Sequence, residues 1–357
     1  MRGYRIALLS GDGIGPVLAE ELRGLLTLLG ERSGFRCETE MLPFGREAFL
    51  KSGTPLPRET VAGIRAADAA IAAAVDAKGV KGPTPVGLLR KELGLFADVR
   101  PIRARPGRWA LREDLDLVVI REITQGFLSD RNLYAGSGEW MSDENTAFSL
   151  RVITYEASRR IADYAFDYAK QNGRRKVTAL HKESIFKLTC GTFLRACRDA
   201  AAAHPAIAYA EEVADNAANG LIAHPERYDV LLTTNLLGDI LSDEAAALVS
   251  SLAPSVNQGP EARVYLPVTH SPAYEALARD AYDPMPAVLC LQMLLQNLGE
   301  TEAAALLDRG ISAVLLGEYP HTSTLLAALR MALSEKEGQA IDFESTNSHE
   351  QRCGAYL

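Results

Sequence analysis

A short apolar run, a turn and a helical pattern follow one another repeatedly along this chain. Residues 4–9 form the first run, which leads through a glycine-rich turn at 11–15 into a helical pattern that reaches about residue 29. Further apolar runs lie at 66–75, 115–120, 176–180 and 228–234. A helix is predicted over residues 154–172, with Gly173 as its stop. This succession predicts an α/β protein in which helices cover a sheet.

Length and charge narrow the functional class. The 357 residues are sufficient for two domains, and a net charge of −8 gives a nucleic-acid partner no electrostatic support. No apolar run approaches the roughly 20 residues that span a membrane, and the N-terminal run is too short for a signal peptide. The five cysteines are scattered without a metal-binding spacing, which favours a reducing cytoplasm.

Arginines gather near the predicted strand ends. Arg90 and Arg100 lie in the segment 89–101, and Arg121 directly follows the apolar run at 115–120. Guanidinium groups bind carboxylates through two parallel hydrogen bonds, so these side chains could hold an acidic substrate. Solvated surface arginines are the alternative interpretation.

Lys182 and two aspartates are candidates for chemistry. Lys182 follows an apolar run, where desolvation could adapt its pKa to proton transfer, although the residues alone favour an exposed lysine at the start of the next helix. Asp239 and Asp243 are four residues apart, which places both carboxylates on one face of a helix beginning near Gly238. Oxygen ligands favour Mg²⁺ or Mn²⁺, with Asp215 as a third carboxylate. Aspartates favoured by the helix dipole are the alternative.

Five segments together resemble one enzyme family. They are GDGIGP (11–16), LRKELGLFADVRP (89–101), VVIRE (118–122), HK (181–182) and YDVLLTTNLLGDILSD (228–243). In this order they resemble the decarboxylating β-hydroxyacid dehydrogenases, which include isocitrate, homoisocitrate, isopropylmalate and tartrate dehydrogenases. The chain is similar to a divergent member of this isocitrate/isopropylmalate dehydrogenase family.

The resemblance implies a fold and an assembly. The fold would be a two-domain α/β structure with a mixed sheet, distinct from the Rossmann fold. Residues 1–102 and 254–357 would form the larger, nucleotide-side domain. Residues 103–253 would form a smaller dimerisation domain, with an arm near 129–150. A homodimer would share its active sites between subunits.

The resemblance also implies a reaction and its residues. A 3-substituted, malate-type hydroxy diacid would be oxidised by NAD with the help of a divalent metal, and its β-carboxylate would leave as CO₂. The implied roles are substrate binding by Arg90, Arg100 and Arg121, acid/base work by Lys182 from the neighbouring subunit, and metal binding by Asp239, Asp243 and the partner's Asp215, which we also count among the catalytic residues.

Several positions depart from the family pattern. Leu128 aligns with the family's acid-donating tyrosine, and Tyr134 is the alternative donor if the intervening residues loop outward. Ser184 replaces an asparagine after the HK lysine. In the adenosine segment the positions that match are His270, Glu275 and Asp283, and Glu275 would favour NAD over NADP by repelling a 2′-phosphate.

The sequence leaves alternatives for the identity of the substrate and for the type of activity. Thr84 and Val86 lie in the segment that would face the C3 substituent, and they resemble the homoisocitrate enzymes. A specialised substrate such as a phosphonate is also compatible. Because the nucleotide segment is altered, two further hypotheses remain: a non-catalytic regulatory or structural paralogue, and a metal-dependent enzyme without redox chemistry.

Overall fold

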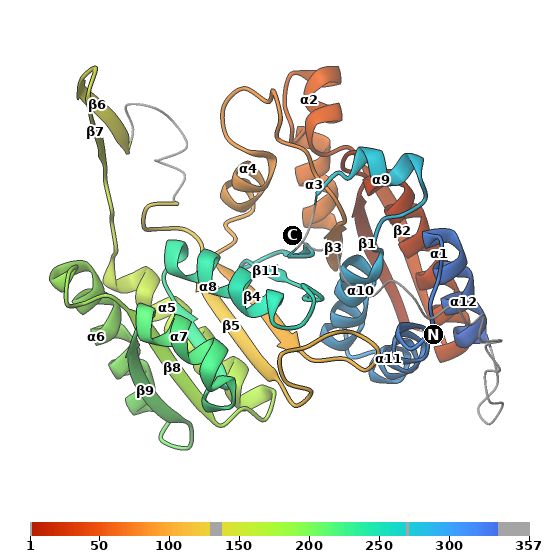
Figure 1. Cartoon of the computed structure of the whole chain (residues 1–357). Helices are drawn as coiled ribbons and strands as arrows, with labels where there is room; N and C mark the ends of the chain where they lie inside the picture. The colour runs from red at the N-terminus through yellow and green to blue at the C-terminus, as the bar shows by residue number, and fades with distance from the viewer. Residues whose placement is uncertain (1, 129–137, 269–270, 335–357) are drawn as a thin grey trace.

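The computed structural model describes residues 2–128, 138–268 and 271–334, and ten of their strands form one sheet (Figure 1). In sheet order these strands are β2 (Phe35–Leu42), β1 (Arg2–Leu9), β3 (Ala69–Ala72), β12 (Arg263–Tyr265), β11 (Val256–Gln258), β4 (Ala97–Arg103), β5 (Asp116–Glu122), β10 (Val230–Thr233), β8 (Lys176–His181) and β9 (Ala208–Val213).

The sheet is mixed, with its antiparallel pairs at the centre. β2, β1, β3 and β12 run parallel to one another, as do β5, β10, β8 and β9. β11 is antiparallel to both β12 and β4, and β4 is antiparallel to β5. The central strand β4 therefore joins two parallel groups of strands.

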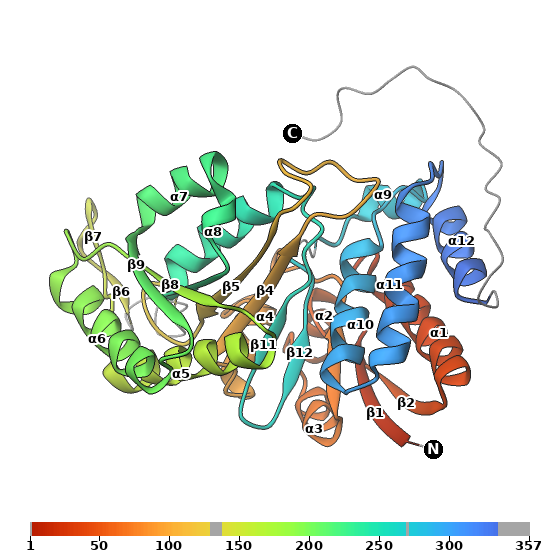
Figure 2. The ribbon, with the colours of Figure 1, turned by 90° about the horizontal axis from the view of Figure 1, so that it is seen from below.

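Helices cover both faces of the sheet. They are α1 (Gly15–Ser33), α2 (Arg46–Ser52), α3 (Arg58–Ala66), α4 (Pro85–Glu92), α5 (Tyr155–Gln171), α6 (Lys187–Ala203), α7 (Ala214–Ala223), α8 (Asn235–Ala247), α9 (Tyr274–Ala278), α10 (Met285–Asn297), α11 (Thr301–Leu315) and α12 (Thr322–Ser334). Figure 2 shows α7 and α8 on one face of the half of the sheet formed by β5, β10, β8 and β9, and α5 and α6 on the opposite face. None of the helices in the described ranges is long and apolar enough to cross a membrane.

Local signals explain the helices that the sequence predicts. The hydroxyl of Thr154 caps α5 by accepting a hydrogen bond from the amide of Ala157, and Ile161 lies on the buried face of this helix. Pro16 occupies the first turn of α1, and Gly34 ends that helix in the left-handed region at φ 74°. Helix α5 follows its predicted bounds of 154–172 closely, whereas α1 continues to Ser33, beyond the predicted end near residue 29.

Two further predicted boundaries are wrong. The apolar run at 66–75 contains only the four-residue strand β3, because α3 extends to Ala66 and the pairing with β1 ends where β1 ends at Leu9. The helix expected to begin near Gly238 begins at Asn235, directly after Thr234, whose extended backbone precedes the first turn.

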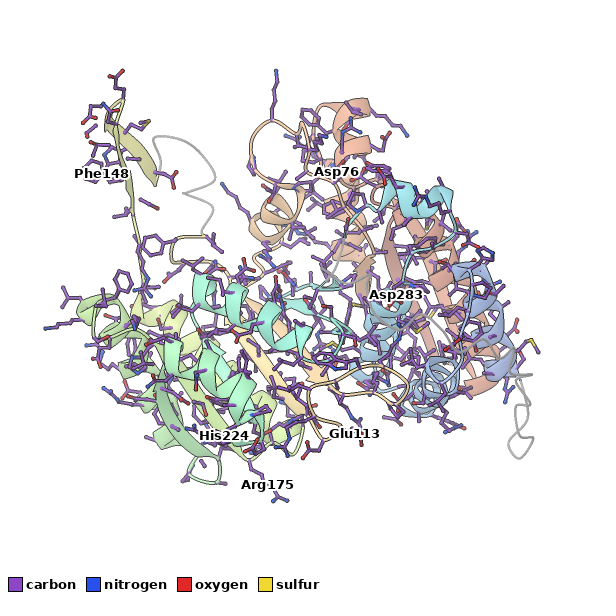
Figure 3. The ribbon with its side chains drawn as sticks, viewed as in Figure 1. Asp76, Glu113, Phe148, Arg175, His224 and Asp283 are labelled. Atoms are coloured by element: carbon purple, nitrogen blue, oxygen red, sulfur yellow. The ribbon has the colours of Figure 1, made fainter. Side chains whose placement is uncertain are left out.

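A two-stranded hairpin projects from the body of the molecule. It consists of β6 (Glu139–Asp143) and β7 (Thr146–Ser149), all of whose residues are exposed. The rings of Trp140 and Phe148 stack at a centroid distance of 5.4 Å. Figure 3 labels Phe148 on this hairpin. The hairpin falls within the predicted arm at 129–150, whereas the division into two domains and the role of the arm in a dimer stay predictions.

Candidate active site

The candidate active site lies where strands meet at one edge of the sheet. β5, β10 and β8 are parallel, so their carboxyl ends share this edge, and the antiparallel strand β4 begins there. Asp98 on β4 lies opposite Arg121 on β5 and opposite Asn257 on β11. Because side chains alternate between the two faces of a strand, Asp98 and Arg100 share one face of β4.

Arg100 is buried among anionic and polar groups. Its Nε donates to Asp98 Oδ2 at 3.0 Å, and its Nη1 donates to Ser242 Oγ at 2.7 Å and to Asp243 Oδ1 at 2.6 Å. Only 8% of its side chain is exposed. A guanidinium so far from water is tolerated because hydrogen-bonded carboxylates compensate its charge.

Arg121 connects strand β5 to helix α8. Its Nε and Nη2 donate to Asn235 Oδ1 at 3.0 and 2.7 Å, and its Nη1 pairs with Asp239. A Cβ atom on Gly238 would lie 2.7 Å from Arg121 Cγ and 2.8 Å from Thr233 Cγ2. The absence of a side chain at this glycine therefore lets α8 approach the end of β5.

Arg90 reaches the same place from helix α4. Its Nε donates to Asn257 Oδ1 at 2.7 Å, and its Nη2 lies 3.5 Å from Asp98 Oδ2. The other oxygen of Asp98 accepts from Ser255 Oγ at 2.7 Å and from Asn257 Nδ2 at 3.3 Å. Arg90 and Arg100 are thus held by one fully buried carboxylate.

Burial and charge together set the pKa values of this cluster. Burial opposes ionisation of Asp98, but the charges of Arg100 and the other two arginines outweigh it and lower the pKa to about 2. Burial lowers the pKa of Arg90 to about 10 and also lowers the pKa of Arg121. Asp98 and Arg90 are therefore ionised at neutral pH.

The three predicted arginines line one cavity of about 550 Å³. Thr84, Val86 and Leu128 also line it, together with Asp239. The hydroxyl of Thr84 additionally caps α4 by accepting from the amide of Gly87. The predicted substrate arginines and the predicted C3-facing residues are thus brought to a single pocket, while their role in binding stays a prediction.

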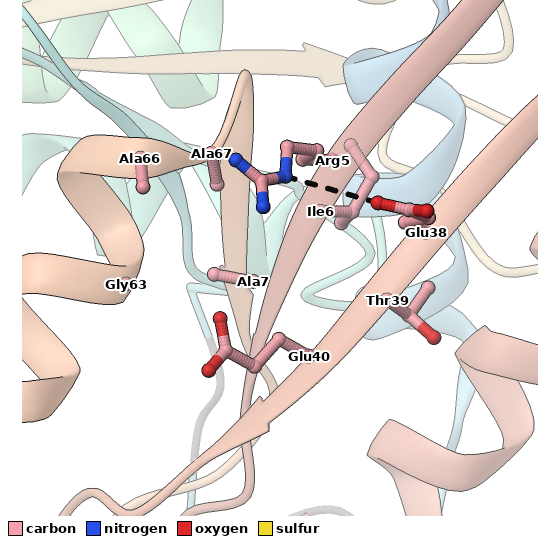
Figure 4. Close-up of a pocket in the computed structure, with 9 residues that line it drawn as sticks. All are labelled: Arg5, Ile6, Ala7, Glu38, Thr39, Glu40, Gly63, Ala66 and Ala67. Carbon is pink, nitrogen blue, oxygen red and sulfur yellow. Dashed lines mark ion pairs between the residues drawn. The ribbon is translucent and has the colours of Figure 1, made fainter.

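A second hollow lies over β1 and the edge strand β2 (Figure 4). Its charged lining consists of Arg5, Glu38 and Glu40, and Arg5 is paired with Glu38 at 3.8 Å. With one arginine among two carboxylates, it lacks the converging cations that an acidic substrate needs. The arginine cavity is therefore the better candidate site.

The predicted metal ligands Asp239 and Asp243 lie one turn apart on α8. Their side chains are 42% and 65% exposed, so oxygen atoms of both remain open to a ligand. Within the described ranges no group of three or more His, Cys, Asp or Glu side chains gathers closely enough to hold a metal ion. Two carboxylates fit a hard divalent cation chemically, but they form only part of a ligand set.

Lys182 and Asp215, the third predicted ligand, lie apart from this cavity. Lys182 follows β8 and pairs with Asp215 on the first turn of α7. The hydrogen bond from Lys182 lowers the pKa of Asp215. Neither residue is among the described residues that line the arginine cavity. Within one chain the structure therefore pairs the predicted proton-transfer lysine with the third predicted carboxylate, away from Asp239.

The predicted cofactor residues lie on different parts of the chain. Glu275 is exposed on the first turn of α9. The segment before this helix contacts the glycine-rich turn, since the amide of Ile14 donates to Pro272 O at 2.9 Å. Asp283 accepts from the amide of Met285 at 2.9 Å and pairs with Arg108 at 3.5 Å. Ser184 is exposed after β8. His270 and Tyr134 lie outside the described residues.

The sequence did not single out four residues that build this site. Asp98, Asn235, Ser255 and Asn257 hold the arginines in place. For Asp98 a signal existed, since its spacing of two from Arg100 on an expected strand places both side chains on one face. The contribution of Asn257 depends on a pairing 159 residues away in sequence, which has no local signal.

The fold of the chain matches a class of enzyme of known structure. The crystal structure of isocitrate dehydrogenase from Methylococcus capsulatus matches with a TM-score of 0.83 at 30% sequence identity, covering 93% of this chain and 100% of that one. The predicted α/β fold with a mixed sheet is confirmed as the isocitrate dehydrogenase type.

Sequence relatives identify the family. The Isocitrate/isopropylmalate dehydrogenase family matches residues 5–340. The 3-isopropylmalate dehydrogenase of Archaeoglobus fulgidus is 38% identical, over 87% of this chain and 91% of the relative. A mitochondrial regulatory subunit of the NAD isocitrate dehydrogenase of Dictyostelium discoideum is 34% identical, over 96% of this chain and 91% of the relative. The chain belongs to the isocitrate/isopropylmalate dehydrogenase family, which confirms the predicted resemblance.

Proposed function

We propose that this protein is a metal-dependent, NAD-linked dehydrogenase that oxidises and decarboxylates a 3-substituted, malate-type 2-hydroxy diacid. The observation that carries the proposal is the convergence of Arg90, Arg100 and Arg121 on one cavity beside Asp239. Three guanidinium groups around a cavity of this kind fit a small molecule with two carboxylates. Membership of a dehydrogenase family supports oxidation at a hydroxyl-bearing carbon.

The residues of the chain would divide the work. The arginines would bind and orient the carboxylates of the substrate. Lys182, supplied by the neighbouring subunit of a homodimer, would accept the proton of the substrate hydroxyl. Asp239 and Asp243, with Asp215 of the partner subunit, would hold Mg²⁺ or Mn²⁺, which would polarise the hydroxyl and the adjacent carboxylate. Ser184, His270, Glu275 and Asp283 would lie along NAD, with Glu275 selecting against a 2′-phosphate.

The test is NADH formation by the purified protein with Mn²⁺ and a panel of hydroxy acids. Malate, tartrate, isocitrate, homoisocitrate, isopropylmalate and phosphonate-bearing malates cover the substituents that the resemblance allows. Absorbance of NADH with one substrate, accompanied by CO₂ release, would support the proposal. The absence of NADH formation with every substrate of the panel, together with undetectable NAD binding by calorimetry, would overturn the proposal.

A non-catalytic role is the second candidate. The similarity to the regulatory protein of Dictyostelium discoideum and the altered adenosine segment around Glu275 favour it. In that case the arginine cavity would bind an acidic effector without turnover. Purification in obligate association with a second, homologous chain, combined with diacid binding but no NADH formation, would support this role over the first.

A further inference from the structure

Asp98 is a fully buried acid at the floor of the arginine cavity. Its carboxylate lies between two cations, accepting from Arg100 Nε at 3.0 Å and from Arg90 Nη2 at 3.5 Å. Its second oxygen is held by Ser255 and Asn257 on the adjoining segment. Every contact of this carboxylate in the described structure is thus to a group that fixes it or to an arginine that lines the cavity.

The charge of Asp98 has a consequence that its hydrogen bonds alone do not have. Burying a carboxylate costs several kcal/mol, whereas an asparagine of nearly the same shape would form part of the same network without that cost. What only the carboxylate supplies is a negative charge behind Arg90 and Arg100. In a site shielded from water, one unit of charge at this distance strongly changes the affinity for an anion.

A second, independent observation concerns the cavity wall beyond the arginines. The apolar side chains of this wall are those of Val86, Leu95, Ile123, Leu128, Leu266 and Pro267, and Thr84, Lys91 and Thr124 also line the cavity. A carboxylate or phosphonate placed against these apolar side chains would lose its hydration without gaining a partner from them. The apolar part of the wall therefore favours an uncharged substituent.

We propose that Asp98 is a specificity-determining residue, which positions Arg90 and Arg100 and offsets part of their charge so that the cavity selects a hydroxy diacid with two anionic groups over one with a third. This inference deepens the proposed function and rests on it. The substituent at C3 is then apolar, and tricarboxylates and phosphonate dianions are disfavoured.

The test compares two anions that cannot be oxidised at a hydroxyl because they have none. Glutarate carries two carboxylates and tricarballylate carries three. Their dissociation constants are measured by calorimetry for the wild-type protein and for Asp98→Asn, both with Mg²⁺. We expect the substitution to shift the affinity ratio toward tricarballylate by roughly tenfold or more, which corresponds to about 1.4 kcal/mol.

A double variant that moves the carboxylate to the neighbouring strand separates the effect of the negative charge from the effect of the side-chain shape. Asp98 and Asn257 lie opposite each other on β4 and β11, and both contact Arg90. The double variant Asp98→Asn/Asn257→Asp keeps one negative charge beside the arginines, so we expect it to restore the wild-type ratio. Equal weakening of both anions in Asp98→Asn, with an unchanged ratio, would overturn the inference and indicate a purely structural role.

A third variant keeps the test decisive if Asp98→Asn does not fold. Val86 is half-buried on α4 at the cavity wall, so Val86→Lys adds a cation without touching the buried network. It should shift the ratio toward tricarballylate, and an unchanged ratio in the folded variant would overturn the inference. If the wild-type protein binds neither anion, the diacid site itself is refuted, and the proposed function fails with the inference.

Discussion

At the scale of single residues, the site places three arginines in a region with little water and compensates each one. Arg121, only 3% exposed, is held by Asn235 and Asp239, whereas Arg100 is held by Asp98 and Asp243. A buried cation without such partners would destabilise the fold by several kcal/mol. Substitutions in this cluster therefore affect folding and binding together, and each test needs a measurement of both.

Asp239→Asn tests the metal assignment. The amide is a weaker ligand for a divalent cation than the carboxylate, so we expect metal-dependent turnover to fall by roughly 100-fold or more. Asp239 pairs with the buried Arg121, but the asparagine retains a hydrogen-bond acceptor and Asn235 still holds the arginine, so we expect only a modest fall in the thermal unfolding temperature. Glu244→Gln on the same helix is the matched control and should retain activity. Wild-type turnover in Asp239→Asn would refute the metal role.

Asp98 also predicts a pH dependence of stability. Its pKa of about 2 in the folded protein lies below the ordinary value of about 3.9 expected after unfolding. Its charge therefore stabilises the fold above about pH 4, and this contribution, on the order of 2 kcal/mol, is lost as the pH falls toward 2. Urea unfolding of the wild type and Asp98→Asn should give free energies that converge over this range. A difference independent of pH would contradict the assignment.

At this scale the sequence pointed to some of the residues that line the cavity and missed others. Arg90, Arg100 and Arg121 could be selected because guanidinium groups near strand ends suit carboxylates and because the resemblance assigns them to the substrate. The structure brings all three to one cavity. Asn235 and Asn257 could not, since an asparagine gains meaning only from the strand or helix it faces. The structure leaves the catalytic roles of these residues as predictions.

At the scale of secondary-structure elements, the approach of α8 to β5 decides the geometry of Arg121. Gly238→Ala would place a methyl group 2.7 Å from Arg121 Cγ, so the helix or the arginine must move. We expect a loss of stability of about 1–3 kcal/mol and an increased KM for the diacid. Chemical denaturation and steady-state kinetics provide the two measurements.

Gly191→Ala is the matched control for that substitution. This glycine lies within helix α6, and its added Cβ would meet only Glu183 Oε1 at 3.6 Å, an ordinary contact. Alanine is the better helix former, so we expect unchanged or slightly increased stability. Equal effects of the two substitutions would show that the close approach at Gly238 is unimportant.

The elements themselves were largely predictable, and their arrangement was not. The predicted runs at 115–120 and 176–180 correspond to β5 and β8, because buried parallel strands are read as continuous apolar segments. The order of strands was not readable, because β4 pairs with β11 across more than 150 residues. The resemblance implied the mixed sheet, which local patterns alone could not supply.

At the scale of the whole molecule, the separation of Lys182 from the arginine cavity leads to a prediction about assembly. If each site combines Asp239 of one subunit with Lys182 of its partner, the variants Asp239→Asn and Lys182→Met should each be nearly inactive. A heterodimer of the two contains one site with both residues intact. Co-expressed in equal amounts, they should recover about a quarter of the wild-type turnover, since half of randomly paired dimers are mixed and have one working site.

The control is the same mixture prepared without subunit exchange, by combining the separately folded proteins immediately before the assay. It should remain inactive, and gel filtration should show dimers in both preparations. Absence of recovery after co-expression would indicate that Lys182 and Asp239 act within one chain, or that Lys182 lies outside the proton path.

The register of β4 has a consequence for how the chain length can vary. Side chains alternate along this strand, so deleting one residue just before Asp98 would turn Asp98 and Arg100 to the opposite face of the sheet and bring Val99 toward the cavity. No single substitution could repair that reversal. Insertions and deletions within residues 97–101 should therefore abolish function, even where the chain still folds.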